Sequence, residues 1–129
     1  MKRNNLCVLL LATAGLVAGC AVKANAPLPA GAVDAVDANA NLILQPAHAF
    51  ALDVSTAILS ADPAQHIELT AAQKNVVLDL NKALNIADKA EIAYHASATP
   101  DGAALLKSSV AAVQTALVAA QAAITVPAK

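Results

Sequence analysis

Apolar side chains recur at alternating spacings of three and four residues in three long stretches of the chain, 33–60, 70–97 and 100–125. Such spacing places them along one side of an α-helix, which turns once every ~3.6 residues. We therefore predict three helices over these ranges, joined by short connections. The fold class that follows is all-α, either an antiparallel three-helix bundle or a long helical hairpin with the third helix folded back.

The predicted core-facing positions are mostly aliphatic, and many of them are alanine. In the first helix they are Val33, Val36, Ala40, Ile43, Ala47, Phe50, Val54, Ala57 and Ala61. In the second they are Val76, Leu80, Ala83, Ala87, Ala90 and Tyr94, widened by Val77 and Leu84, and in the third Leu106, Val110, Val113, Leu117, Ala120 and Ile124. Alanine lets helices approach closely but buries little surface, so the larger side chains, with Phe50 the largest, are expected to carry the stability.

The start of each later helix has a recognisable capping pattern. Thr70 and Gln73 have the spacing of a capping box, in which each side chain bonds the other residue's backbone N–H. Thr99 precedes Pro100, the residue type favoured at the first helical position. The second and third helices should therefore begin beside Thr70 and Thr99.

The first helix has acidic residues at its start and a proline inside it. Asp34 and Asp37 fall in its first turn, where the helix dipole favours anions. Pro46 lacks a backbone donor and clashes with the carbonyl four residues earlier, so we expect a kink or a break there.

The N-terminus has the layout of an export signal. Lys2 and Arg3 are followed by an uncharged apolar run over 6–19, which ends in Val17-Ala18-Gly19-Cys20. A membrane span needs ~20 apolar residues, so this run is short for an anchor and suits a signal peptide. The last four residues resemble the lipobox of bacterial lipoproteins, a family in which the signal is cleaved before the cysteine.

This resemblance implies that residues 1–19 are a lipoprotein signal peptide and that fatty-acyl chains such as palmitate are attached to Cys20. Cys7 would be discarded with the signal, so no disulfide would remain. Ala21, in place of an aspartate, implies the outer membrane of a cell envelope, facing the periplasm. A conventional secretory signal or a weak membrane anchor is the alternative reading of the same residues.

Residues 20–32 are predicted to form a flexible tether, since Pro27 and Pro29 oppose helix formation there. Residues 33–126 then form the helical domain, and 127–129 a short tail. The tether would reach roughly 30 Å if extended.

Composition agrees with helix and narrows the range of partners. The chain is 58% hydrophobic, with Phe50 and Tyr94 as its two aromatic residues. Without residues 1–19 it holds six basic and nine acidic residues, a net charge of −3. A negative chain without a basic patch argues against a nucleic-acid partner.

The histidines do not have the spacing of a metal site. His48, His66 and His95 include no pair four residues apart, whereas a structural zinc site needs about four closely placed ligands. His48 would approach His95, near Asp53 or Glu91, if the first two helices packed antiparallel. We nevertheless expect exposed histidines, no metal and no cofactor.

No arrangement of side chains predicts catalysis. Asp88 lies close to Glu91 and His95 in the sequence, and the last two form an i, i+4 pair that is ordinary on a helix surface. Ser108 and Ser109 lack the glycine-flanked setting of a nucleophilic serine. The expectation is a protein that is not an enzyme and has no catalytic residue.

The chain end adds a second resemblance. A small, alanine-rich helical lipoprotein that ends in lysine, here Lys129, is similar to the murein-type lipoproteins, whose terminal lysine is joined to peptidoglycan. Pro46, Pro100 and the absence of a basic cluster before Lys129 depart from that family. We therefore do not expect attachment to peptidoglycan through Lys129.

These features together predict a non-enzymatic, membrane-anchored envelope lipoprotein that presents a helical module for protein or cell-wall contacts. The Ala-rich helix faces are candidates for self-association or for a protein partner. The alternative is a phage-derived or lysis-type accessory lipoprotein that perturbs or bridges membranes.

Overall fold

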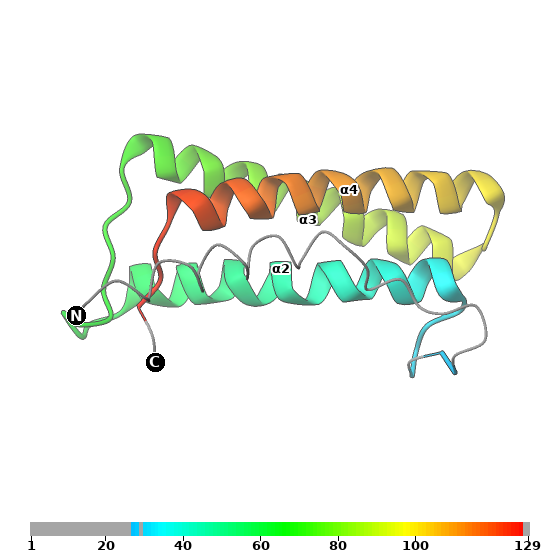
Figure 1. The fold of residues 1–129 in the computed structure, drawn as a ribbon, viewed down its shortest axis with the longest axis horizontal. Helices are drawn as coiled ribbons and strands as arrows, with labels where there is room; N and C mark the ends of the chain where they lie inside the picture. The colour runs from blue at the N-terminus through cyan, green and yellow to red at the C-terminus, as the bar shows by residue number, and fades with distance from the viewer. Residues whose placement is uncertain (1–26, 29, 128–129) are drawn as a thin grey trace, which may run out of the picture.

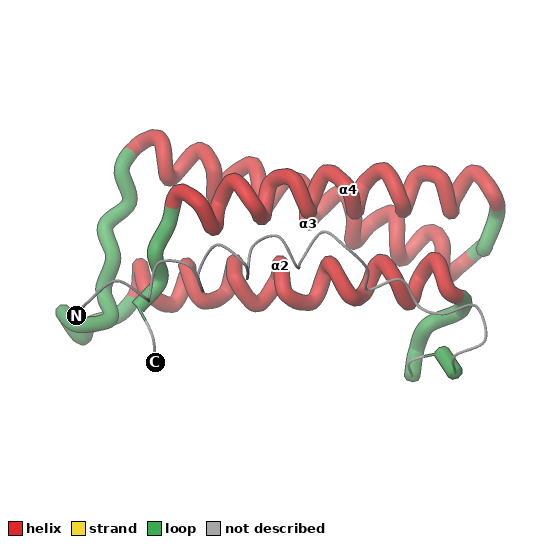
Figure 2. The backbone as a smooth tube through the Cα atoms, viewed as in Figure 1, coloured by secondary structure: helices red, strands yellow, loops and turns green. Residues whose placement is uncertain are grey.

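A computed structural model describes residues 27, 28 and 30–127 of the chain. It contains three α-helices, α2 (Ala35–Leu59), α3 (Ala71–Ala96) and α4 (Pro100–Ala123), and no strand within the described residues. Helices α2 and α4 run in one direction and α3 in the other (Figure 1). The prediction of an all-α, antiparallel three-helix bundle is confirmed, and the loops lie at its two ends (Figure 2).

The start of each helix is fixed by a side chain that accepts backbone hydrogen bonds. Asp34 caps α2 by accepting from the N–H groups of Val36 and Asp37. Thr70 and Gln73 form the predicted capping box at the start of α3. Thr99 accepts from the Gly102 N–H at the start of α4. These bonds satisfy donors that the first turn of a helix leaves free.

Pro46 does not break the first helix. Helix α2 continues through it as a single 25-residue element (Figure 1). Pro46 lies on an exposed side of α2, and Leu42, whose carbonyl loses its usual partner, is 44% exposed. Water can therefore reach the unpaired carbonyl, which lowers the cost of a proline inside a helix.

The core lies along the predicted apolar positions of all three helices, with a few departures in α2. Within α3 and α4 the buried residues follow the expected spacing, and every expected position of α4 is buried. In α2, Val33 is 46% exposed, Ala61 lies beyond the end of the helix, and Leu44 is buried instead. The core consists of Ala40, Leu44, Ala47, Leu80, Leu84, Ala87, Ala90, Tyr94, Leu106, Val110, Val113, Leu117 and Ala120.

The two aromatic residues differ in how far they are buried. Phe50 was expected to be the largest core side chain, but it is only partly buried at the edge of the core. Tyr94, which was also expected to face the core, is buried, at 3% exposure. Its ring lies against the start of α4, where a Cβ on Gly102 would come within 3.2 Å of it. The missing side chain of Gly102 therefore leaves room for the Tyr94 ring.

The three helices do not pack equally. Helices α3 and α4 share the most extensive contact, whereas α2 contacts each of them less. The first described residues lead into α2 at the end of the bundle where α3 ends and α4 begins (Figure 1). Polar side chains link α2 to α3 at this end, which we call the α3–α4 loop end.

Candidate functional site

A hydrogen bond joins the end of α3 to the start of α2 at the α3–α4 loop end. The Tyr94 hydroxyl, in the last turn of α3, donates to Oδ2 of Asp34 over 2.5 Å. The Oδ1 atom of the same carboxylate caps α2. The Asp34 carboxylate thus caps the start of α2 with one oxygen and holds the last turn of α3 with the other. These two helix ends are therefore fixed relative to each other.

The same hydrogen bond shifts the pKa of both partners. Donation from Tyr94, followed by the Asp37 N–H, lowers the pKa of Asp34 below its ordinary value. Acceptance by Asp34, together with burial, raises the pKa of Tyr94. Both shifts favour the ionised carboxylate and the neutral phenol, the pair that the hydrogen bond requires.

Asp37 is a fully buried carboxylate one turn further along α2. Its Oδ2 accepts from the Val33 N–H over 2.9 Å and lies 2.8 Å from Nε2 of His95. Its Oδ1 is buried and has no hydrogen-bond partner. Buried carboxylate oxygens are nearly always satisfied, so this atom requires an explanation.

Glu91 completes a cluster with Asp37 and His95. One donor atom from each of the three residues lies within 4.8 Å of the other two. Burial raises the pKa of Glu91, and the negative charge of Asp37 raises it further. Two carboxylates and one imidazole therefore share a small, partly buried volume with excess negative charge.

The helix dipoles suit the charges of this cluster. Asp37 lies in the first turn of α2, where the dipole stabilises a negative charge, and His95 lies in the last turn of α3, where it stabilises a positive one. The antiparallel packing of α2 against α3 brings these two ends together. The arrangement can hold a cation or a proton between buried oxygen and imidazole nitrogen.

This geometry corrects the interpretation of Glu91 and His95 as an ordinary surface pair. His95 contacts Asp37, which belongs to another helix and is 0% exposed, and Glu91 has an oxygen atom within 4.8 Å of it. Spacing within one helix does not reveal such a partner. His95 itself keeps 39% of its side chain exposed, so only its Nε2 side faces the buried carboxylate.

His48 does not join His95, although α2 and α3 pack antiparallel. Its Nε2 lies 2.9 Å from Oδ1 of Asp88 in a partly exposed pair between the two helices. His66 lies exposed in the loop between α2 and α3. The expectation of exposed histidines thus describes His48 and His66 but not the contact side of His95.

The two serines considered as nucleophiles donate to the backbone. The hydroxyls of Ser108 and Ser109 bond the carbonyl of Leu105 over 2.9 and 2.8 Å, respectively. Ser109 is buried, whereas Ser108 is exposed. Both hydroxyls therefore bond the backbone of their own helix, as serine side chains inside helices commonly do.

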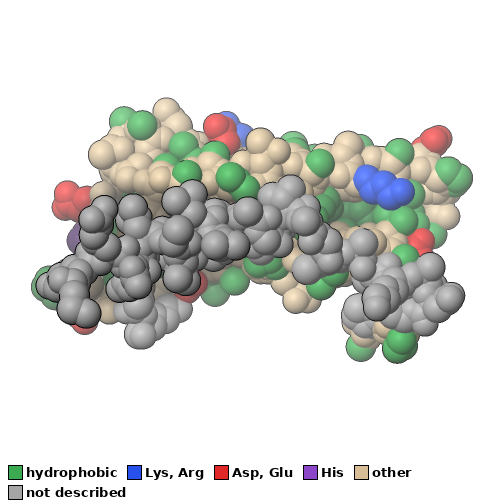
Figure 3. Space-filling view, viewed as in Figure 1, with side chains coloured by type: hydrophobic (Ala, Val, Ile, Leu, Met, Phe, Trp, Pro, Cys, Tyr) green, Lys and Arg blue, Asp and Glu red, His purple; other side chains and the backbone are tan. Residues whose placement is uncertain are grey.

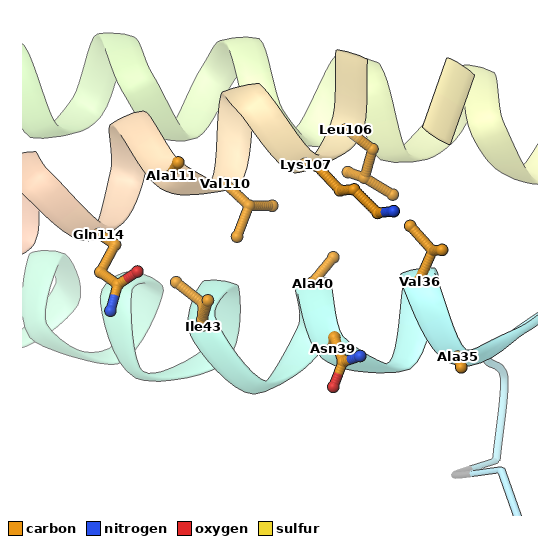
Figure 4. A pocket seen from close by; sticks show the side chains of 10 residues that line it. All are labelled: Ala35, Val36, Asn39, Ala40, Ile43, Leu106, Lys107, Val110, Ala111 and Gln114. Carbon is orange, nitrogen blue, oxygen red and sulfur yellow. The ribbon is translucent and has the colours of Figure 1, made fainter. Parts of the chain in front are cut away.

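A shallow groove of about 330 Å³ runs between α2 and α4. Lys107 reaches across it from α4 towards Val36 of α2, and Gln114 projects into its other end (Figure 4). Its other lining residues are mainly small or aliphatic. The groove reflects the looser packing of α2, and it offers few groups with acid–base or metal chemistry.

Much of the surface carries no charge. From Ser108 to Ala128 the sequence has no charged residue, and charged side chains are few and scattered over the visible part of one face (Figure 3). By length and composition alone, α2 and α4 are apolar enough to cross a membrane, a criterion that core helices also meet. Exposed large side chains include Leu42, Leu52, Leu59, Leu78, Ile86, Ile92, Leu105 and Val118.

The residues expected to carry the lipid signal lie outside the described part of the chain. These are Cys20 with the three lipobox residues before it, and the same holds for Lys129. No protein-family model matches the chain, and no curated protein or solved structure matches it.

Proposed function

We propose that this chain is a non-enzymatic envelope lipoprotein, anchored through lipid on Cys20, whose helical bundle makes protein or cell-wall contacts. The observation that carries the proposal is the order of the N-terminal features. Lys2 and Arg3 precede an apolar run that is short for a membrane span, and the run ends in Val17-Ala18-Gly19-Cys20. Acylation at that cysteine would anchor everything that follows it.

The position of the bundle supports a tethered arrangement. Helix α2 starts at Ala35, 15 residues after Cys20, and Pro27 and Pro29 lie between them. Proline keeps such a segment extended, and two or more acyl chains hold a protein stably at a membrane. The bundle would stand clear of the lipid headgroups on the periplasmic face of the outer membrane.

The surface of the bundle supports contacts with other molecules. Helix α3 exposes Leu78, Ile86 and Ile92, and α4 exposes Leu105 and Val118. A core this rich in alanine buries little surface per residue, so added contacts through the helix faces would stabilise the fold. Self-association is the simplest form of such contact. Sedimentation that shows a monomer at all concentrations, with a melting temperature independent of concentration, would contradict it.

The anchor is tested in the native host with wild type, Cys20→Ala and, as the matched control, Cys7→Ala. Intact mass of the wild type and of Cys7→Ala should show a chain that begins at Cys20 and carries acyl chains. Cys20→Ala should remain unacylated and uncleaved before residue 20. A wild-type chain that begins upstream of Cys20, or carries a free thiol there, would refute the proposal.

A second candidate is a lysis-type accessory lipoprotein that perturbs or bridges membranes. The exposed apolar residues of α2, with Leu52 at 67% and Leu59 at 83%, favour it. Induced expression distinguishes the two functions. Cells should stay intact if the bundle only makes protein or cell-wall contacts, and should leak a periplasmic marker enzyme if it perturbs membranes.

A further inference from the structure

We propose that Asp37, Glu91 and His95 form a binding site for a divalent transition-metal cation, with Zn²⁺ the metal that fits best. The three side chains come from α2 and α3, and their donor atoms lie within 4.8 Å of one another. The site is independent of the lipid anchor, because it depends only on the packing of these two helices.

The unsatisfied oxygen of Asp37 is the observation that points to a ligand. Asp37 is 0% exposed, and its Oδ1 has no hydrogen-bond partner. The carboxylate faces the cluster, since its Oδ2 lies 2.8 Å from Nε2 of His95. A buried, unpaired carboxylate oxygen is costly unless an ion or a water molecule satisfies it.

The spacing of the donors suits a small cation. Zinc binds imidazole nitrogen and carboxylate oxygen at about 2.0–2.2 Å, which places tetrahedral ligands about 3.3 Å apart. The pair Asp37–His95 would open slightly from 2.8 Å, and Glu91 would move in from at most 4.8 Å. Neither Glu91 nor His95 is buried, so the closure needs small rotations of two side chains that lie partly in solvent.

The chemistry of the donors selects the metal. An imidazole with two carboxylates suits Zn²⁺ and its neighbours, whereas Mg²⁺ and Ca²⁺ prefer sites made of oxygen alone. On binding, the cation replaces the proton on Nε2 of His95, and that proton passes to solvent. Three protein ligands leave a fourth position for water on the exposed side. The cation also offsets the repulsion between Asp37 and Glu91.

Zinc binding is measured by titration calorimetry on the full chain in a mild detergent, after removal of metals. Thiolates bind zinc strongly, so Cys7 and Cys20 are replaced by serine in every protein compared. We expect one saturable zinc per chain and a raised melting temperature at saturation. Glu91→Gln and His95→Gln should each weaken binding by about tenfold or more.

The matched control is His48→Gln, which removes a histidine from the pair with Asp88 and should leave zinc affinity unchanged. Glu91→Gln keeps the shape of a partly exposed side chain, so circular dichroism should show it folded. X-ray absorption of the bound zinc should give one imidazole with oxygen ligands. Absence of saturable binding, equal affinity in wild type and both site variants, or tighter Mg²⁺ than Zn²⁺ binding would overturn the site.

Discussion

Tyr94 and Asp34, 60 positions apart in the sequence, are joined by a 2.5 Å hydrogen bond at the α3–α4 loop end. The bond connects the last turn of α3 to the capping residue of α2. Helix α2 makes the less extensive contacts in the bundle. The polar contact at its capping residue therefore helps to fix where α2 begins and how it lies against α3.

Replacement of Asp34 by alanine should lower the free energy of unfolding by about 1–2 kcal/mol, since α2 loses its N-cap. Asp34→Asn should lower the unfolding free energy less than Asp34→Ala does. Its amide oxygen still caps the helix, and only the charged acceptor of the Tyr94 hydroxyl is lost. Urea unfolding measures both. Asp79→Ala, at an exposed residue of α3, is the control, and its unfolding free energy should stay within about 0.5 kcal/mol of the wild-type value. Equal stability of Asp34→Ala and wild type would contradict the cap.

Tyr94→Phe keeps the buried ring and removes only the donor, so its effect should depend on pH. The pKa of Asp34 is lowered in the folded state, so its contribution is complete above the unfolded pKa of about 3.9 and is lost as pH falls through the lowered value. The pKa of Tyr94 is raised, so its contribution is complete below about pH 10 and is lost as pH rises through the raised value.

The difference in unfolding free energy between wild type and Tyr94→Phe should therefore be widest between about pH 4 and pH 10. Urea unfolding at a series of pH values measures it. The difference should narrow at both extremes. A difference that stays constant across the series would show that the hydroxyl does not interact with an ionised Asp34.

Glu91→Gln should stabilise the metal-free protein at neutral pH. The pKa of Glu91 is raised in the folded state, chiefly by burial and then by Asp37. Its ionised form therefore destabilises the fold above the raised pKa, and this penalty disappears below the unfolded pKa of about 4.3. We expect a gain of a few tenths of a kcal/mol, since solvent screens a partly exposed carboxylate. Melting curves of wild type and Glu91→Gln in chelator at pH 7 and pH 4 test this prediction. A gain in stability seen only at pH 4 would contradict it.

The fold could be predicted from the sequence because the apolar periodicity and the capping residues indicate the same helix boundaries. Thr70 and Thr99 mark helix starts through local hydrogen bonds, and each helix begins and ends within about two residues of its predicted range. Pro46 was harder to interpret. Its effect depends on whether the carbonyl of Leu42 meets water or protein, and that is a property of tertiary packing.

The polar cluster was not predicted, although the sequence contains a hint of it. Asp37 lies four residues after Val33 and three before Ala40, on the buried side of α2, so a charged residue occupies a core position. Its partner His95 lies 58 positions later, and only the antiparallel packing of α2 against α3 brings them together. Patterns within one helix identify neither the partner nor the resulting burial.

The Gln73 side chain links the start of α3 to the end of α4. Its Oε1 accepts from the Thr70 N–H over 2.9 Å, and its Nε2 donates to the carbonyl of Ala123 over 2.8 Å. Gln73→Glu keeps the first bond but places a carboxylate against that carbonyl, and should cost about 1 kcal/mol. Hydrogen exchange at the Ile124 N–H should then accelerate, whereas Thr70→Ser, which keeps the cap, should leave it unchanged. Unaltered exchange in Gln73→Glu would contradict the link.

Adjacent leucines of α4 test which side of this helix faces the core. Leu106 is 0% exposed and Leu105 is 54% exposed. Leu106→Ala should lower the unfolding free energy by about 2–5 kcal/mol, because it removes buried surface and leaves a cavity. Leu105→Ala should cost less than about 1 kcal/mol, since most of its surface already contacts water. Urea unfolding measures both.

Phe50→Ala adds a comparison at the edge of the core. Truncation of a fully buried phenylalanine to alanine lowers the unfolding free energy by about 3–5 kcal/mol. Phe50 is only partly buried, so Phe50→Ala should lower the unfolding free energy by less, as measured by urea unfolding. Leu106, Val110 and Val113 of α4 all belong to the buried core. Equal losses of unfolding free energy from Leu105→Ala and Leu106→Ala would contradict the rotation of α4 described here, in which Leu106 is buried and Leu105 is exposed.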